Sequence, residues 1–376
     1  MGVAILNAIK DVFPSIPDYI CHFHFLKDIG KDLFGHDYST IRRHLKTHRI
    51  RSHLRKMAKA LKKVIDSNPD SLQCLDRYLK SKALTIAQTP LPPQVTTYLI
   101  ISWILEAKNE SHGFGFPFDR PHFDFYLRLQ EAYPVLQGLK QKMVADASLL
   151  LLAPISKTLA DRALASTVLR MQEKLRIFDQ LRAAMRIAQP DSQAGLNDEG
   201  DADIETIRSR VIAFRLSHEI EELSASHIAY TKMVKQIDKY WDKLFAEPIV
   251  VVTKTGTVTL QPQRTNNILE QFFRYLKRQG RKRNGNHALT KALTTMLAQT
   301  PLVKNLDNPQ YMEIILNGKA TLAERFADID IVQVRKLFAQ EQKVTQKYPK
   351  RMAEVFKITH FPRRLGISSA KKAFCS

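Results

Sequence analysis

The chain has 376 residues, 44% of them hydrophobic and 25% charged, and its formal net charge is +21 at pH 7. This length allows a sizeable core, three widely spaced cysteines give no disulfide framework, and the longest aliphatic run, Leu149–Ala153, is too short to cross a bilayer. The sequence shows neither a signal peptide nor an amphipathic membrane anchor. We therefore expect a cytoplasmic, nucleoid-associated protein whose positive charge favours nucleic acid over membrane.

The first predicted element is an amphipathic helix over Met1–Phe13, with apolar residues spaced three to four apart. Pro14 and Pro17 end this helix. A short buried strand over Tyr19–Phe25 and a helix over Leu26–Phe34 are predicted next. One strand of this length cannot make a sheet alone, so its partners must come from elsewhere.

Residues 39 to 245 have an almost entirely helical pattern, which includes one long helix over Lys157–Gln189. The polar, acidic segment Pro190–Asp203 is predicted to be a mobile loop. A seam typical of helix-on-helix packing follows, formed by Tyr230, Val234, Ile237, Trp241 and Leu244.

A β-hairpin is predicted after the helical region. Its arms are Ile249–Thr253 and Thr257–Leu260, β-branched on both sides of a Thr255-Gly256 turn. Residues 265–267 are expected to cap a helix that runs to about Gln279, and the remaining residues are mostly helical and basic. The fold class expected is therefore mainly α with a small α/β part.

Basic residues gather in three clusters: ten between Arg42 and Lys63 with no acid, six between Arg274 and Arg283, and eleven between Arg335 and Lys372. One such run is usually a solvated helix face. Three acid-poor runs in one chain repel each other unless a polyanion is bound, which favours nucleic acid. The predicted DNA-contacting residues are Arg42, Arg43, Lys46, Arg49, Arg51, Arg274, Lys277, Arg278, Arg281 and Lys282.

The first motif that could carry chemistry is Cys21-His22-Phe23-His24. Cys21 and His24 have zinc-ligand spacing, and the His44-x-x-x-His48 pair could complete a four-ligand set. The strongly basic helix around His44 argues against a dication there. The alternatives are a plainly packed Cys and His, or a motif of transposase type.

The second motif is the helix from Thr265 to Arg278. Helical geometry groups one apolar stripe for burial (Leu269, Phe272, Phe273 and Leu276) and places Glu270 on another face in a row of cations (Arg274, Lys277 and Arg281). The alternative interpretation is structural: Asn267 and Glu270 have capping-box spacing, and Glu270 with Arg274 is an ordinary i,i+4 pair.

The sequence resembles bacterial DDE transposases of the group shared with Mutator-like elements. The resemblance rests on three features in order: a Cys-x-x-His motif after a helix ending in Phe-Pro, a long helical spacer, and a Thr-Asn-Asn-x-x-Glu helix followed by Lys-Arg. The resemblance identifies Glu270 with the catalytic, metal-ligating Glu of that family. It matches Cys21 and His24 to the Cys/Asp-x-x-His motif near the active site, and Asn266 and Asn267 to the polar pair before the Glu. Arg274, Lys277 and Arg278 match basic positions facing DNA.

The resemblance implies an RNase H-like fold interrupted by a large helical insertion, with the two motifs close together in space. It also implies Mg²⁺ as cofactor and DNA, both element ends and target, as partner, while homo-oligomerisation on DNA is left open. The expected domains are a partial RNase H-like segment (1–38), a helical insertion (39–246), a hairpin with the catalytic-Glu helix (247–300) and a basic helical region (301–376).

The sequence departs from the family pattern at the two catalytic Asp positions. Both should lie upstream of the first helix, and Asp11 and Asp18 fall after the required place. Because two-metal chemistry needs several carboxylates, we expect an interrupted or mis-started reading frame whose isolated chain is inactive, with Glu270 paired to Arg274 instead. The rivals are a non-catalytic nucleic-acid-binding helical protein derived from a mobile element, and a helical scaffold with no nucleic acid partner.

Overall fold

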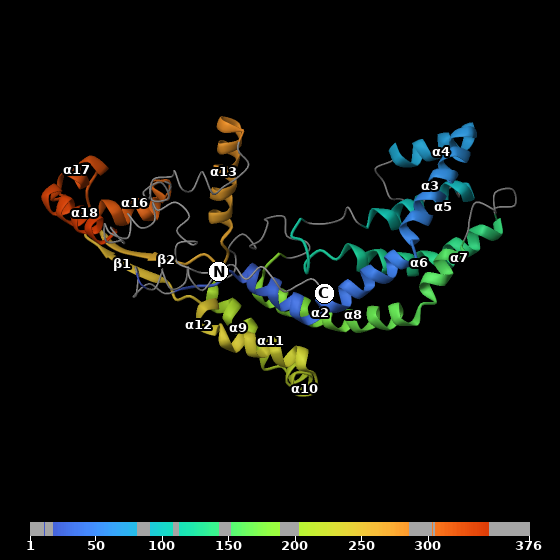
Figure 1. The fold of residues 1–376 in the computed structure, drawn as a ribbon, viewed down its shortest axis with the longest axis horizontal. Helices are drawn as coiled ribbons and strands as arrows, with labels where there is room; N and C mark the ends of the chain where they lie inside the picture. Colours follow the sequence, from blue (N-terminus) through green and yellow to red (C-terminus); the bar gives the residue numbers. More distant parts are fainter. Residues whose placement is uncertain are drawn as a thin grey trace, which may run out of the picture. The chain divides into compact units, whose positions relative to one another are not determined.

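The computed structural model describes Asp11, Val303 and residues 18–80, 91–107, 113–142, 152–188, 203–285 and 305–345. The chain divides into two compact units. Unit 1 comprises residues 1–248 and 261–294, and unit 2 comprises residues 249–260 and 295–376. Helices account for most of the described residues (Figure 1), which confirms the prediction of a mainly α protein.

Unit 1 is helical in its described part. Its helices are α2 (His22–Thr47), α3 (Ile50–Ser67), α4 (Pro69–Lys80), α5 (Pro93–Glu106), α6 (Pro121–Lys142), α7 (Ala153–Leu159), α8 (Arg162–Met185), α9 (Ile204–Arg215), α10 (His218–Ser226), α11 (Ile228–Lys239), α12 (Trp241–Leu244) and α13 (Asn267–Asn284). The boundary expected between residues 38 and 39 falls inside α2, which is one continuous helix.

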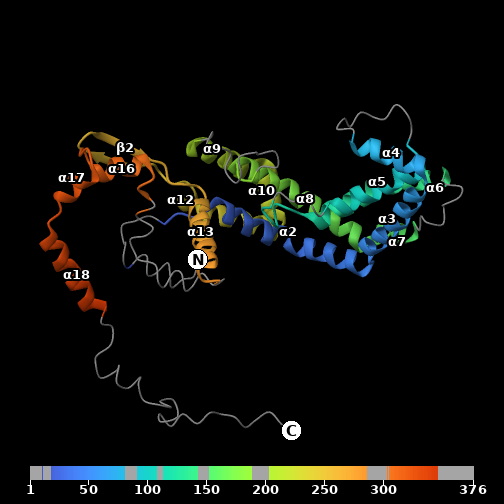
Figure 2. The ribbon, with the colours of Figure 1, turned by 90° about the horizontal axis from the view of Figure 1, so that it is seen from above.

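The centre of unit 1 is the packing of α2 along α8, which lie side by side in both views (Figures 1 and 2). Apolar residues recur along α2 at helical spacing and are almost fully buried, among them Leu26, Ile29 and Phe34. At Gly30, α2 packs closely against Pro117: a Cβ there would overlap the Pro117 ring. The glycine therefore permits this close approach.

An ion cluster around one buried carboxylate joins the same two helices. The carboxylate of Asp37 on α2 is 3% exposed and accepts hydrogen bonds from the Arg170 guanidinium at 2.9 and 2.7 Å and from the Lys174 ammonium at 2.7 Å. Burial raises the pKa of Asp37, but the hydrogen bonds from the two cations more than offset it, and the pKa lies below its usual value. The two cations thus allow an ionised acid inside the core.

The predicted seam over Tyr230–Leu244 is confirmed, although it spans two short helices rather than one. Tyr230, Ile237 and Leu244 are buried, and Val234 and Trp241 pack partly buried against the same core. Through this face α11 contacts α2.

Two of the predicted elements differ from the structure. The strand expected over Tyr19–Phe25 is absent, because the chain is irregular up to Cys21 and α2 begins at His22. The long helix over Lys157–Gln189 is divided into α7 and α8. Asp161 ends the continuity, since its side chain accepts the Leu164 N–H at 3.1 Å and caps a new helix. The helix predicted over Met1–Phe13 and the loop over Pro190–Asp203 lie almost wholly outside the described residues.

Unit 2 contains the predicted hairpin and short helices. β1 (Ile249–Thr253) pairs antiparallel with β2 (Gly256–Leu260), with Val251 opposite Val258. Gly256 opens the second strand instead of closing the turn. The Lys254 N–H donates to Oδ1 of Asn317 at 2.9 Å, which ties the turn to the end of α16 (Pro309–Leu316); α17 (Leu322–Ala327) and α18 (Ile331–Thr345) follow.

The hairpin is the only sheet within the described residues. It groups with the C-terminal helices in unit 2, while α13 belongs to unit 1. Within the same described ranges, none of the helices has both the length and the apolar character needed to cross a membrane.

Candidate functional site

Three segments that are far apart in the sequence meet at the start of α2 (Figure 1). Ile20, just before α2, bonds to α12 (Trp241–Leu244), where its N–H donates to the Lys243 carbonyl at 3.1 Å. His22, the first residue of α2, bonds to the chain before α13, where its N–H donates to the Arg264 carbonyl at 2.8 Å. The side chains of Asp18 and Lys243 form an ion pair beside these bonds. The beginning of α2 is thus joined by one backbone hydrogen bond to α12 and by another to the chain before α13.

His22 is a buried part of this junction. Its ring is 1% exposed, and Nε2 donates to the Leu244 carbonyl at 2.6 Å. Burial lowers the pKa of His22 to about 4, with the Leu244 carbonyl opposing and Arg264 adding to this shift. The ring is therefore neutral at pH 7 and fastens the two chain segments, which assigns it a structural role.

Cys21 and Asn266 connect the two motifs directly. The Cys21 thiol donates to Oδ1 of Asn266 across 3.2 Å. Asn266 occupies the N-cap position of α13, yet its side chain makes no capping hydrogen bond. The predicted capping by residues 265–267 is therefore not made through Asn266, because its carboxamide oxygen is engaged by the thiol. Asn267 is the first helical residue rather than a cap, so the capping-box alternative does not apply either.

His24 and Glu270 face each other one turn into their helices. Nε2 of His24 lies 3.9 Å from Oε1 of Glu270, and both side chains are about half exposed, at 48% and 45%. The expectation that Glu270 pairs with Arg274 is wrong: within the described residues, the partner in ion-pair range is His24. The bonds at Cys21 and Arg264 hold the start of α13 at the start of α2 and so bring Glu270 near His24.

The apolar stripe of α13 is less covered than expected. Phe272, Phe273 and Leu276 are half-buried instead of buried, and the side chain of Leu269 lies outside the described residues. The predicted DNA-contacting residues of this helix are all exposed: Arg274, Lys277, Arg278, Arg281 and Lys282. α13 consequently presents five cations to solvent in the turns that follow Glu270.

The chemistry of this site is limited by its ligand types. It offers one carboxylate, one imidazole and one thiol, whereas Mg²⁺ prefers several oxygen ligands in an octahedron. Among the described residues, no group of three His, Cys, Asp or Glu ligands includes Glu270. These side chains do not by themselves fit a Mg²⁺ site, and further acids are needed to complete one.

The four-ligand zinc set expected as an alternative is not formed. From His24 to His44 the chain stays within α2, and 20 helical residues rise about 30 Å. His44 and His48 instead contact Asp161, each at 2.8 Å. One continuous helix, α2, therefore separates Cys21 and His24 from His44 and His48, so the four residues cannot bind one ion.

The first basic cluster lies on the last turns of α2 and on α3. Arg42, Arg43, Lys46 and Arg49 are exposed. Arg51 is not a free surface cation, because its guanidinium donates to the Pro121 carbonyl at 3.0 Å and lies 4.1 Å from the centre of the Phe125 ring. Most of the third cluster lies outside the described residues, and Arg335 and Lys336 within it are exposed.

Two residues with distant partners could not be predicted from the sequence: Arg264 at this junction and Asp161 at the other end of α2. Arg264 donates to the Met185 carbonyl at 2.8 Å and is partly buried, and burial together with nearby Arg186 lowers its pKa. Asp161 likewise had no local signal, because its partners His44 and His48 are more than a hundred residues away. The sequence offered one clue to this junction, the Asn266-Asn267 pair that precedes Glu270 in the family motif.

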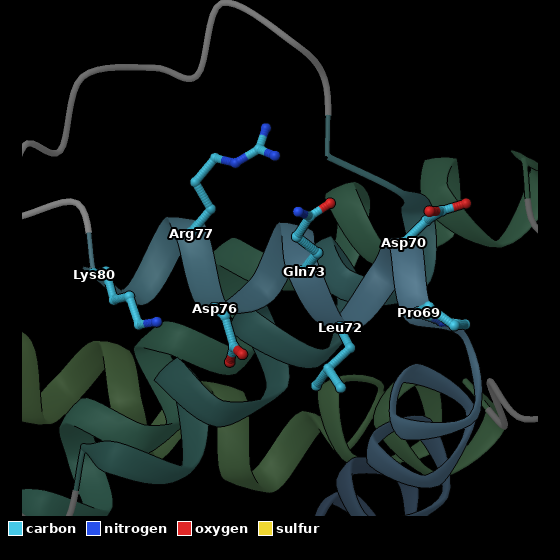
Figure 3. Close-up of a pocket in the computed structure, with 7 residues that line it drawn as sticks. All are labelled: Pro69, Asp70, Leu72, Gln73, Asp76, Arg77 and Lys80. Carbon is cyan, nitrogen blue, oxygen red and sulfur yellow. The ribbon is translucent and has the colours of Figure 1, made fainter.

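A surface pocket elsewhere in unit 1 is built on α4 alone (Figure 3). Its charged lining residues are Asp70, Asp76, Arg77 and Lys80, and the close-up shows them pointing away from the helix in different directions. Mixed charges that do not converge give no recognisable binding or catalytic arrangement, so we assign it no function.

Comparison with protein-family models, with curated proteins and with solved structures finds no match to this chain.

Proposed function

We propose that this chain is the Glu-bearing, C-terminal part of a DDE transposase and that it binds DNA along α13. The observation that carries the proposal is the meeting of the two motifs: Cys21 contacts Asn266, and His24 approaches Glu270, although the two members of the first pair are 245 residues apart in the sequence. The family resemblance implies this proximity, and nothing in composition or helical spacing requires it.

The roles proposed for the site residues follow from their contacts. Glu270 would be the acid that this chain contributes to a metal site completed by other acids, because it is half exposed and none of the described cations of α13 is in ion-pair range of it. Cys21 and Asn266 would position the start of the Glu270 helix, since their bond joins the two helix starts. His24 would orient the Glu270 carboxylate. In this proposal α2 and α13, which carry the site at their starts, belong to an RNase H-like domain.

The exposed cations of α13 suit a phosphate backbone. Arg274, Lys277 and Arg278 lie within the two turns that follow Glu270 and are all exposed, and each phosphate neutralised by such a residue releases a condensed counterion. DNA bound there would pass close to the Glu270 carboxylate. The exposed cations at the end of α2 begin about 30 Å away, a distance that a duplex of roughly ten base pairs covers.

The second candidate function is non-catalytic binding of nucleic acid by a helical protein derived from a mobile element. The observation that favours it is the single carboxylate at the site within the described residues. Both proposals expect DNA binding, and they differ in whether Glu270 takes part in chemistry.

Strand cleavage and strand transfer on the native element ends separate the two candidates. The 376-residue chain alone should give no product with Mg²⁺ or Mn²⁺, because one carboxylate cannot position two ions. A protein extended by the upstream coding sequence should be active, and Glu270→Gln should abolish that activity while DNA affinity is kept. The matched control is Glu313→Gln, at a position in unit 2. Activity that survives Glu270→Gln, or cleavage by the chain alone, would rule out the assignment of Glu270.

A further inference from the structure

Two histidines and one aspartate converge at the end of α2 that is remote from Glu270. His44 and His48 are one helical turn apart, so their rings share one face of the last turn. Nδ1 of His44 and Nε2 of His48 each lie 2.8 Å from the same oxygen, Oδ2 of Asp161. The three ligand atoms are all within 4.8 Å of one another.

Asp161 is fixed for this contact by its place in the fold. It caps α8, and its Oδ1 accepts the Leu164 N–H at 3.1 Å, which leaves Oδ2 directed at the two rings. A carboxylate held through its other oxygen is the usual outer-shell arrangement of a metal ligand, because it sets the orientation of the donor atom in advance. The break between α7 and α8 therefore places Oδ2 of Asp161 against the rings of His44 and His48.

From this geometry we propose that His44, His48 and Asp161 bind one transition-metal dication such as Zn²⁺. Zinc binds imidazole nitrogen and carboxylate oxygen at about 2.0–2.2 Å, so small movements of the three side chains would bring their atoms around one ion. The side chains are 25%, 14% and 18% exposed, respectively, which leaves room for a water molecule as fourth ligand. The proposal does not depend on the transposase assignment.

The donor set also selects the kind of metal. Two imidazoles and one carboxylate suit Zn²⁺, Co²⁺ or Ni²⁺, whereas Mg²⁺ and Ca²⁺ require mainly oxygen ligands. The exposed cations Arg43 and Lys46 lie on the same last turns of α2 as the two histidines. Their positive charge repels a dication, so electrostatic attraction alone would not hold a metal there. Coordination by nitrogen is what would retain the metal there.

The bound ion would have a structural role. It would clamp the last turn of α2 to the turn between α7 and α8, in the helical region and about 30 Å along α2 from His24. The competing interpretation is a hydrogen-bonded clamp without metal, in which two neutral rings each donate one N–H to Oδ2 and saturate its two acceptor positions. The two interpretations differ in their response to added metal.

The test is a Co²⁺ titration of the full chain after chelator treatment, followed by displacement with Zn²⁺ and thermal melting. The expected result is one Co²⁺ per chain with visible d–d absorption, loss of that absorption on adding Zn²⁺, and a rise in Tm of roughly 5 °C at saturating Zn²⁺. Asp161→Asn keeps a good helix cap but removes the charged ligand, so it should weaken Co²⁺ binding at least about a hundredfold. His48→Gln should do the same.

The matched control is His53→Gln, a partly buried histidine of α3 outside the group. This variant should bind Co²⁺ as the unaltered chain does. Undiminished Co²⁺ binding in Asp161→Asn and His48→Gln would overturn the proposal, because the ion would then be bound elsewhere. Absence of Co²⁺ absorption and of any Zn²⁺ effect on Tm would overturn it as well and leave the hydrogen-bonded clamp as the explanation.

Discussion

The thiol of Cys21 lies 3.2 Å from Oδ1 of Asn266 and joins the residue before α2 to the residue before α13. This contact replaces the side-chain cap that Asn266 would otherwise give its own helix. The orientation of Glu270 therefore depends on a residue at the opposite end of the helical spacer.

Removal of this thiol should loosen the start of α13. Cys21→Ala leaves Asn266 without its donor and should cost about 1 kcal/mol of unfolding free energy, with faster amide hydrogen exchange in the first turns of α13. Cys21→Ser restores an O–H donor and should recover most of the protection. Cys74→Ala, at a half-buried cysteine of α4, is the control. Equal exchange in α13 for Cys21→Ala and the unaltered chain would show that the contact does not hold the helix.

Two glycines of α2 should respond in opposite directions to the same substitution. A Cβ at Gly30 would overlap Pro117 and lie 3.0 Å from Phe178, so Gly30→Ala should destabilise unit 1 by about 1–3 kcal/mol. A Cβ at Gly35 meets its nearest atom, in Phe116, at 3.9 Å, so Gly35→Ala should stabilise it by about 0.5–1 kcal/mol. Urea denaturation measures both. A stabilising Gly30→Ala would contradict the close packing of α2.

The ion cluster at Asp37 should matter far more than the surface pairs of the same helix. Asp37→Asn leaves Arg170 and Lys174 without their shared anion and should cost roughly 2–3 kcal/mol. Asp28 pairs with Lys31 at 3.0 Å on the surface, so Asp28→Asn should change stability by less than about 0.5 kcal/mol. Similar effects of the two substitutions in chemical denaturation would mean that Asp37 is not the buried anchor of α2 on α8.

His22 should make the stability of unit 1 depend on pH. Its folded pKa of about 4 lies below the usual unfolded value of about 6.5, so the unfolded chain binds the extra proton between these values. Stability should therefore fall as the pH drops from 6.5 toward 4, by up to about 3 kcal/mol. The difference in unfolding free energy between the unaltered chain and His22→Gln isolates this contribution. A difference that stays constant from pH 7 to pH 4 would show that His22 does not titrate as described.

Local patterns predicted the hairpin at Ile249–Leu260 and the seam ending at Leu244, because alternation and helical periodicity reflect which face is buried. They failed at Tyr19–Phe25, where a short apolar run predicts a strand although the residues from His22 onward belong to α2. They failed again at Asp161, where the cap that this residue gives to the Leu164 N–H divides the predicted long helix.

The candidate site divides in the same way. The family motif brought Cys21, His24 and Glu270 into consideration, and the structure brings them together. Helical spacing alone paired Glu270 with Arg274, because an i,i+4 rule considers one helix only. The contact with His24 depends on the backbone hydrogen bond between His22 and Arg264, which no local pattern contains.

DNA binding is the property on which the proposed function depends most directly. The measurement is the affinity for a random duplex at several salt concentrations, for the unaltered chain and two variants of equal charge change. One variant replaces Arg274, Lys277 and Arg278 of α13 by Gln, and the other replaces three exposed lysines of α11: Lys232, Lys235 and Lys239.

With about six phosphates neutralised, log K should fall against log salt with a slope near −5. The α13 variant should reduce this slope by roughly 3, while the α11 variant should leave it nearly unchanged, because the proposed DNA path follows α13 and the end of α2 and does not include α11. Binding that is independent of salt or undetectable would contradict the account, and so would equal losses in the two variants.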